Sequence, residues 1–427
     1  MNILFQTLGC KVNQYETETM REALENMGHT CNKDLPIDTV VINSCSVTAE
    51  SDRKTRQLVR RMRREHPNAV IALTGCMVQA FPEEAKKMTE ADIIVGNKDV
   101  KNVIEAIKSY DNNRIFNVES HENGDTYNTI GLSSFNERTR AFMKIQDGCD
   151  RFCTYCIIPY ARGRVRSRSI EDIKNESQRL AKNGYSEIVL VGINLTSYGK
   201  GENFDLCDAI DTVCKTEGIK RVRLGSLEPD HITDEMLYRM KAQPNFCPQF
   251  HLSLQSGCDE TLKRMNRHYD CAFYEDLVKR IRTIFTDAAI TTDIMVGFAG
   301  ENEEEFNKSL NFAKKIGFAR AHIFTYSRRS GTVAAGLKMQ ISNYEKQKRA
   351  RLMTEATKQT EIEFLKGQIG KTYPVLFETQ SDTTAEGYTP NYTRVIVNTQ
   401  SAISEQIKNV LIKAVENDCC IGELIEQ

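Results

Sequence analysis

The sequence predicts an α/β protein in three parts: an N-terminal domain with an open parallel sheet, a central partial (β/α)6 barrel, and a small antiparallel β-barrel at the C-terminus. Short apolar runs alternate with amphipathic stretches up to about residue 110 and again from about residue 139, which is the pattern of parallel strands joined by helices. After Gly370, apolar and polar residues alternate one by one, which is typical of antiparallel strands.

The first domain is expected over residues 1–112. Its strands are predicted at 3–9, 39–44, 69–75 and 92–96, and its helices near 14–27, 50–65, 79–88 and 98–108. Residues 113–136 are polar and rich in turn-forming residues, so they are expected to form a linker.

The central barrel is expected over residues 137–366. Six strands are predicted at 140–146, 187–192, 220–225, 249–254, 290–297 and 320–326, with helices near 170–183, 204–216, 233–241, 259–284 and 302–316. Six repeats make a shorter barrel than the usual eight, and its chemistry is expected at the carboxyl ends of the strands. Residues 343–367 predict one long helix, and residues 367–427 predict the small β-barrel domain.

Composition narrows the function classes. The chain has no apolar run that could span a bilayer, and its first residues lack the pattern of a signal peptide, so no membrane association and a cytoplasmic location are expected. Fourteen cysteines in that compartment indicate metal or redox chemistry rather than disulfides. The seven histidines include no HxxxH or HxxH pair, which favours iron–sulfur over zinc.

Three stretches are strongly basic although the net charge is −1. They are residues 53–64, the alternating Arg162, Arg164, Arg166 and Arg168, and a group formed by Lys346, Lys348, Arg349 and Arg351. Such clusters can bind a polyanion such as RNA, and the alternative is an ordinary solvated helix face.

The most informative stretch contains Cys149, Cys153 and Cys156, with three and then two residues between them. Thiolates this close in sequence hold iron–sulfur clusters, and three ligands leave one iron of a 4Fe–4S cube open. Tyr155 stands between the second and third cysteines, where its ring can lie against an adenine or pack beside the cluster.

A second set consists of Cys10, Cys45 and Cys76, each of which directly follows a predicted parallel strand. Because the carboxyl ends of such strands share one edge of the sheet, these three cysteines are expected to converge and to hold a second cluster. The alternative is that they are small buried hydrophobic residues.

The CxxxCxxC motif after the first barrel strand resembles the radical S-adenosylmethionine superfamily. The stretches TLGCKVNQYE, INSCSVT and LTGC, together with CTYCIIPYARGRVRSR and HLSLQSG in the barrel, resemble the methylthiotransferases within it. The C-terminal domain resembles TRAM, an RNA-binding module. The resemblance implies two 4Fe–4S clusters: one on Cys149, Cys153 and Cys156 that binds S-adenosylmethionine, and an auxiliary one on Cys10, Cys45 and Cys76 that supplies sulfur.

The resemblance also implies a set of cofactor and RNA contacts. Gly192 and Asn194 occupy the place of the Gly-Gly-Glu motif that holds the methionine amino group, although the glutamate is absent. Residues at successive strand ends are expected to contact ribose or methionine, with capping and turn formation as the alternative; they are Ser226, Glu228, Gln255, Ser256 and Asp293. Arg162, Arg164, Arg166 and Arg168 are expected to meet tRNA phosphate or a substrate carboxylate.

Residues 11–15 resemble the branch of the family that adds a methylthio group to C2 of N6-threonylcarbamoyladenosine, next to the anticodon at position 37 of tRNA. Alternatives are the branches acting on isopentenyladenosine in tRNA or on an aspartate of a ribosomal protein. An alternative of a different class is a non-catalytic iron–sulfur RNA-binding protein. The expected partners are the tRNA anticodon loop, which presents unstacked bases, and an electron-donor protein, with the chain itself a monomer.

Overall fold

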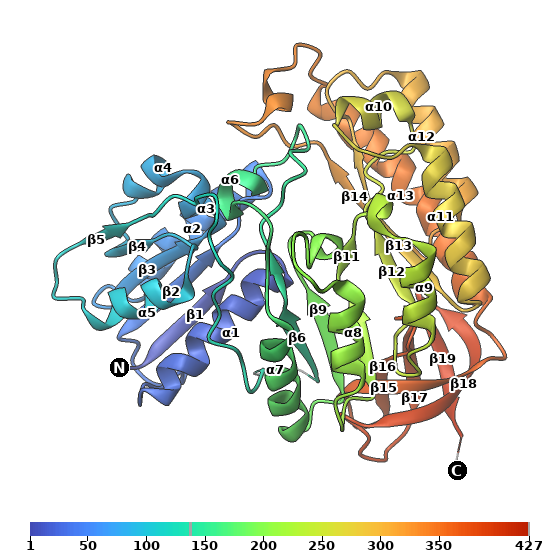
Figure 1. Ribbon diagram of the computed structural model, residues 1–427, viewed down its shortest axis with the longest axis horizontal. Helices are drawn as coiled ribbons and strands as arrows, with labels where there is room; N and C mark the ends of the chain where they lie inside the picture. Colours follow the sequence, from blue (N-terminus) through green and yellow to red (C-terminus); the bar gives the residue numbers. More distant parts are fainter. Residues whose placement is uncertain (136–138, 426–427) are drawn as a thin grey trace.

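The computed structural model describes residues 1–135 and 139–425. It contains the three expected parts: an N-terminal α/β domain, a central barrel, and a C-terminal β-barrel beneath the central one (Figure 1). The boundary predicted between linker and barrel at 136/137 and the predicted end at 427 lie outside the described residues. Within the described residues, no helix combines the length and apolar character needed to cross a membrane.

The N-terminal sheet is parallel, with its strands in the order β1-β2-β3-β4-β5. The strands are β1 (Ile3–Thr7), β2 (Thr39–Ser44), β3 (Val70–Gly75), β4 (Ile93–Val95) and β5 (Ile115–Asn117). The helices are α1 (Lys11–Asn26), α2 (Ala49–Glu65), α3 (Cys76–Ala80), α4 (Pro82–Lys86) and α5 (Val100–Lys108). The first four strands match the prediction because their buried apolar runs are continuous.

The fifth strand corrects the predicted linker at its start. β5 lies within 113–136 and pairs with β4 through Ile93 and Ile115. Its three residues are too few and too exposed to give a periodic signal. Farther along this range, Leu132 and Phe135 are buried in the core of the central barrel, so the segment is packed against the protein over part of its length.

The six predicted barrel strands are present and parallel, in two sheets of order β10-β9-β6 and β11-β12-β13-β14. They are β6 (Arg140–Lys144), β9 (Glu187–Val191), β10 (Arg221–Leu224) continued by β11 (Ser226–Leu227), β12 (Gln249–Leu252), β13 (Ala289–Val296) and β14 (Arg320–Thr325). The short strands β7 (Gln146–Asp147) and β8 (Arg166–Ser167) pair beside them. The barrel is thus a partial one, as predicted.

The barrel helices are α6 (Ile158–Arg162), α7 (Ile170–Lys182), α8 (Leu206–Cys214), α9 (Asp234–Lys241), α10 (Asp259–Arg264), α11 (Cys271–Ile284) and α12 (Glu303–Ile316). The single helix predicted over 259–284 is wrong, because α10 and α11 are separate. Asn266 between them has a positive φ of 58°, and Asp270 caps α11 by accepting a hydrogen bond from the Phe273 amide.

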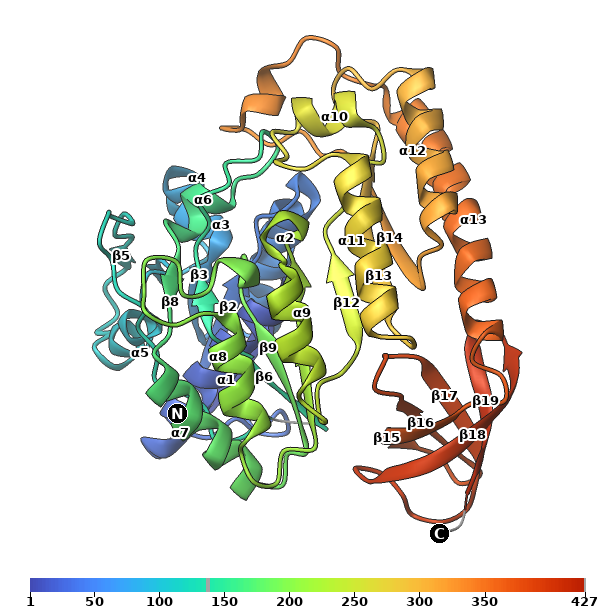
Figure 2. The same cartoon turned by 45° about the vertical axis from the view of Figure 1, so that its right-hand side comes forward.

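Helix α13 (Asn343–Lys366) runs from the barrel to the C-terminal domain (Figure 2). That domain is a closed barrel of order β15-β16-β17-β19-β18, formed by β15 (Thr372–Gln380), β16 (Thr384–Tyr388), β17 (Arg394–Asn398), β18 (Ile407–Glu416) and β19 (Cys419–Leu424). The prediction of a purely antiparallel barrel is corrected at one pair, because β17 and β19 are parallel. Five strands that alternate in direction cannot close without one parallel pair.

A buried ionic group joins the two barrels. Glu187 lies among Arg140, Arg221 and Arg223, whose combined charge lowers its pKa although burial alone would raise it. Arg221 and Arg223 also donate to carbonyl oxygens of the C-terminal domain, at 2.8 Å to Tyr388 and 2.9 Å to Pro390. The C-terminal domain therefore packs against the barrel near the amino ends of β9 and β10.

Candidate functional site

The cysteines of the N-terminal domain lie at the carboxyl edge of its sheet. Cys10 precedes the first turn of α1, Cys45 follows β2, and Cys76 begins α3 directly after β3. Gly9 has a φ of 124°, and a Cβ there would lie 3.0 Å from the Cβ of Cys45, so the first two loops touch and a side chain is excluded between them. The parallel sheet thus brings together three cysteines that are distant in sequence.

Nitrogen donors surround the sulfur of Cys76. Arg162 Nε donates to Cys76 Sγ at 3.1 Å and Asn97 Nδ2 at 3.8 Å. Burial raises the pKa of Cys76 to about 12, and Arg162 is the strongest influence in the opposite direction. The same pKa is raised by Cys45 and Cys10, because the three thiols lie within electrostatic range of one another. Hydrogen bonds from N–H groups to sulfur are a usual feature of iron–sulfur sites.

The second set lies in the loop between β7 and α6. Burial raises the pKa of Cys149 to about 11 and that of Cys156 to about 12, and the Cys153 thiol adds to both shifts. Each sulfur again has an N–H donor: Asn194 Nδ2 at 3.8 Å from Cys149, Arg267 Nη1 at 3.3 Å from Cys153, and the Ile158 amide at 3.4 Å from Cys156.

These donor sets suit clusters rather than single ions. Across residues 1–135 and 139–425, no three His, Cys, Asp or Glu side chains lie close enough together to hold one metal ion. A 4Fe–4S cube binds each thiolate through a different iron, so its ligands lie farther apart than those of one ion. Three thiols at each of two places, with N–H donors at Cys76 and at all three sulfurs of the second set, therefore fit two iron–sulfur clusters.

A cavity of about 490 Å³ is lined by residues of the N-terminal domain, by residues of the barrel strands, and by Tyr392 of the C-terminal domain. Cys10, Lys11 and Val12 line one side. The barrel side includes Gly192, Ser226, His251, Asp293, Arg320 and His322. One predicted cluster ligand, Cys10, therefore shares a single hollow with three predicted cofactor residues, Gly192, Ser226 and Asp293.

Gly192 and Asn194 are arranged around Gln146. A Cβ on Gly192 would lie 2.7 Å from Gln146 Oε1, so a larger residue would displace that side chain. The same oxygen accepts from the Asn194 amide at 2.7 Å. This bond holds the backbone of Asn194, and the side-chain Nδ2 of the same residue points at Cys149 Sγ.

Glu228 and Tyr155 meet at Arg267, which sequence reasoning missed. The Arg267 guanidinium donates to Glu228 Oε2 at 2.5 Å and to the Tyr155 hydroxyl at 3.3 Å, as well as to Cys153. Arg151 holds the same Glu228 oxygen at 3.2 Å. Neither arginine has a spacing that marks it in the sequence, because the partners of each lie on other barrel loops.

Gln255 and Ser256 follow strand β12, whereas Asp293 lies within β13 and not at its end as predicted. Gln255 has a left-handed φ of 66°, and its amide donates to the Asp293 carbonyl at 2.9 Å. Asp293 Oδ2 lies 3.4 Å from His251 Nε2. Ser256 is fully buried, and its hydroxyl has no hydrogen-bond partner among the described residues. A buried hydroxyl of this kind is costly unless a ligand or water satisfies it.

Burial contradicts the prediction that Arg162, Arg166 and Arg168 contact RNA. Arg168 pairs with Glu176 at 2.8 Å, and Arg166 pairs with Asp147 at 3.4 Å. All three side chains are buried. The fourth, Arg164, is 54% exposed, lies over the Phe152 ring at 4.9 Å and remains available to a phosphate.

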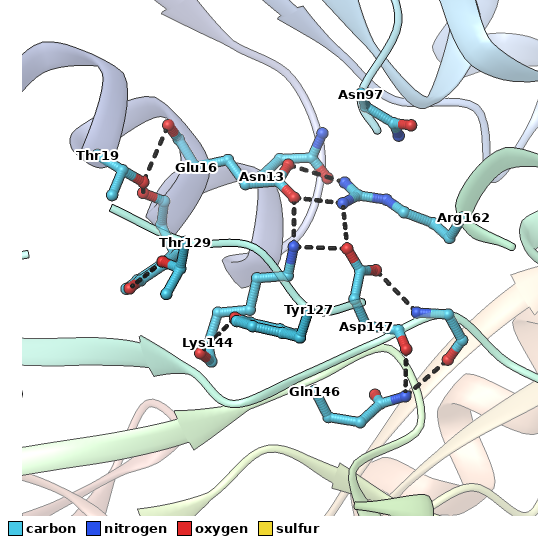
Figure 3. A network of polar contacts seen from close by, with 12 residues as sticks. Asn13, Glu16, Thr19, Asn97, Tyr127, Thr129, Lys144, Gln146, Asp147 and Arg162 are labelled. Atoms are coloured by element: carbon cyan, nitrogen blue, oxygen red, sulfur yellow. Dashed lines mark hydrogen bonds and ion pairs between the residues drawn. The ribbon is translucent and has the colours of Figure 1, made fainter. Parts of the chain in front are cut away.

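Arg162 instead belongs to a buried network between the two cysteine regions (Figure 3). Its guanidinium donates to both carboxylate oxygens of Glu16, and Lys144 Nζ lies 2.7 Å from Glu16 and 2.6 Å from Asp147. Burial alone would raise the pKa of Glu16, but Arg162 and Lys144 together bring it below its ordinary value. Together with Arg166, the network contains three cations, Arg162, Arg166 and Lys144, and two carboxylates, Glu16 and Asp147. A thiolate at Cys76 would bring the net charge of the network to zero.

Comparison with known proteins places the chain in a family. Residues 143–313 match the radical SAM superfamily, and residues 2–96 match the uncharacterized protein family UPF0004. The threonylcarbamoyladenosine tRNA methylthiotransferase MtaB of Bacillus subtilis is 36% identical over 96% of this chain and 94% of its own length. MtaB of Thermotoga maritima is 39% identical over 88% and 86%.

A second kind of relative is the tRNA-2-methylthio-N(6)-dimethylallyladenosine synthase of Malacoplasma penetrans, 35% identical over 99% of this chain and 88% of its own. The fold is also that of the radical S-adenosylmethionine methyltransferase TsrM from Kitasatospora setae, with a TM-score of 0.59 and 13% identity over 78% of this chain and 77% of TsrM. By its identity to full-length relatives, the chain belongs to the radical S-adenosylmethionine methylthiotransferase family.

Proposed function

We propose that this protein is a tRNA methylthiotransferase that modifies C2 of N6-threonylcarbamoyladenosine at position 37, beside the anticodon. The observation that carries the proposal is the cavity that Cys10 shares with Gly192, Ser226 and Asp293. It places Cys10 of the N-terminal set opposite barrel residues that are proposed to contact the cofactor. The relatives named as MtaB support this choice of nucleoside.

In this proposal Cys149, Cys153 and Cys156 hold the 4Fe–4S cluster that binds S-adenosylmethionine, and Cys10, Cys45 and Cys76 hold the auxiliary cluster. When bound, these groups supply the sulfur, the methyl group and the radical chemistry that an unactivated aromatic C–H bond requires. The chain positions them. Asn194 and Arg267 place N–H groups on sulfurs of the first cluster, and Arg162 does so for Cys76.

Tyr155 and Glu228 are held by Arg267 at the edge of the Cys153 loop, where they can orient adenosine and methionine groups. Gln255, Ser256 and Asp293 lie on one loop and the neighbouring strand. The orphaned Ser256 hydroxyl is suited to bind a polar group of the cofactor.

The walls of the cavity favour the threonylcarbamoyl group over an isopentenyl group. Lys11 and Arg320 bring positive charge to the cavity, and His251 and His322 add polar surface. The threonyl part of the modification ends in a carboxylate, which such donors bind well, whereas an isopentenyl chain is apolar.

Mass spectrometry of nucleosides and peptides tests the proposal. Reconstituted protein, S-adenosylmethionine and a reductant are incubated with tRNA that carries N6-threonylcarbamoyladenosine or isopentenyladenosine, or with the ribosomal protein. We expect the methylthio product with the first substrate only. Methylthiolation of the ribosomal aspartate or of isopentenyladenosine instead would assign another branch. Absence of 5′-deoxyadenosine with every substrate would point to the non-catalytic RNA-binding alternative.

The remaining partners are part of the same proposal. An electron-donor protein supplies the reducing electron, and the chain works as a monomer in the cytoplasm, where its tRNA substrate is found. The C-terminal β-barrel acts as a TRAM-like module, and Arg164 is the arginine after the cysteine motif that remains placed to contact RNA.

A further inference from the structure

A basic groove runs along α2, apart from the cavity described above. Its volume is about 600 Å³. It is lined by Gln6 and Leu8 of the first strand region and by Lys54, Gln57, Leu58, Arg60, Arg61 and Arg64 of the helix. No acidic residue belongs to this lining. The groove therefore offers a run of positive charge on one face of the N-terminal domain.

The amphipathic pattern of α2 explains why these cations face solvent. Leu58, Val59 and Met62 are buried in the core beside the sheet, so the residues between them must point outward. Arg60 pairs with Glu90 at 3.2 Å and Arg61 with Glu65 at 3.9 Å, but these exposed pairs are weak and can yield to another anion.

Burial separates this group from the other basic stretches. Arg162, Arg166 and Arg168 are enclosed by carboxylates. In the third group Lys346 donates to the Tyr326 carbonyl and Arg349 pairs with Glu301, and both are buried, whereas Lys348 and Arg351 are exposed. By contrast, Lys54, Arg60, Arg61 and Arg64 are all exposed, and Lys54 and Arg64 form no ion pair within the described residues.

The groove adjoins the proposed active site. Gln6 and Leu8 line the groove, and the next residues of the same segment, Cys10 to Val12, line the cavity. The first turn of α2 is fixed to the segment after β14, because the Ala49 amide donates to Ser327 Oγ at 3.1 Å and Arg329 pairs with Asp52 at 2.6 Å. Consecutive parts of one segment therefore line the groove and the cavity, and a chain lying in the groove can follow that segment toward Cys10.

We propose that this groove binds the sugar–phosphate backbone of the tRNA anticodon arm and guides the target base to the cavity. The inference rests on the proposed tRNA substrate, and RNA is the polyanion that fits an array of exposed arginines. The groove supplies affinity rather than base choice, because phosphate contacts carry no sequence information.

Salt dependence of binding tests the proposal. Full-length reconstituted protein is titrated with an anticodon stem-loop RNA at several salt concentrations, as wild type and as the triple variant Arg60→Gln, Arg61→Gln, Arg64→Gln. The plot of log K against log salt has a negative slope, and removing one arginine–phosphate pair reduces the magnitude of that slope by about 0.7 to 0.9. Removing all three pairs should therefore reduce the magnitude of the slope by about 2 to 3 and weaken binding at low salt.

A matched control removes the same charge elsewhere. Lys174, Lys182 and Lys215 are exposed on or next to α7 and α8, and their replacement by Gln should leave the slope within about 0.5 of wild type. Circular dichroism checks that both triple variants are folded. A wild-type slope in the α2 variant, or an equal change in the control, overturns this inference even where wild-type protein modifies the tRNA. If wild-type protein neither binds nor modifies tRNA, the proposed function itself fails.

Discussion

Replacing Arg162 with Gln should be among the most destabilising single changes to charged residues in this chain. The guanidinium is 0% exposed, and its loss leaves Glu16 with Lys144 as its remaining cation. Removing one partner of a buried ion pair costs about 3–5 kcal/mol, because the other charge stays desolvated. The hydrogen bond to Cys76 Sγ is lost as well.

Arg164→Gln is the natural control because it removes the same group two residues away. Arg164 is 54% exposed and lies 3.6 Å from Asp150, so its loss should cost at most about 1 kcal/mol. The chain contains no tryptophan, and unfolding in urea is best followed by circular dichroism. The comparison is made on the apo proteins, so that cluster loss does not contribute to the difference.

A double variant separates the ion pair from simple loss of packing. Glu16→Gln with Arg162→Gln removes both charges, so it should be less destabilised than the sum of the two single variants by about 1–3 kcal/mol. The reasoning is refuted if Arg162→Gln loses no more stability than Arg164→Gln, or if the two single effects simply add.

Three further outcomes are expected. Cys10→Ala should lower the iron content of reconstituted protein by about half and leave the cluster on the Cys149 loop intact by electron paramagnetic resonance; loss of both clusters would contradict two separate sites. Arg320→Gln should raise KM for tRNA with N6-threonylcarbamoyladenosine by about tenfold or more, since a charged hydrogen bond contributes about 1.5–3 kcal/mol. An equally large loss of binding affinity for tRNA that lacks the modification would be the opposing result. Glu187 has a lowered pKa in the folded protein, so its stabilising charge is fully present above the ordinary pKa of about 4.3 and is lost as pH falls through the lower folded pKa. Glu187→Gln should therefore make the free energy of unfolding less dependent on pH below about pH 4. An unchanged pH dependence in this range would argue against the role of Glu187.

Much of the fold follows from local pattern. The strands of both parallel regions were predictable because buried parallel strands are continuous apolar runs, and the helices between them show one apolar face. The positions of Cys10, Cys45 and Cys76 directly after three such strands also predicted that they converge, since parallel strands share a carboxyl edge.

Contacts between distant segments could not be predicted in this way. The arginines that follow the cysteine motif are equally compatible with RNA binding and with burial. Arg162 and Arg168 are buried because Glu16 and Glu176, contributed by α1 and α7, lie against them. The role of Arg267 could not be predicted from the sequence for the same reason, since its partners Glu228 and Cys153 come from other loops.

The sequence by itself determined the order of strands and helices, the family and the six cysteines that point to clusters, because spacing along the chain encodes each of these. The tertiary structure decided which basic residues face solvent and which are enclosed by carboxylates. That outcome depends on which segments pack against each other, since the environment of a charge is set by its neighbours in space. Arg162, Arg166 and Arg168 are therefore buried among carboxylates, whereas Lys54, Arg60, Arg61 and Arg64 of α2 are exposed to solvent.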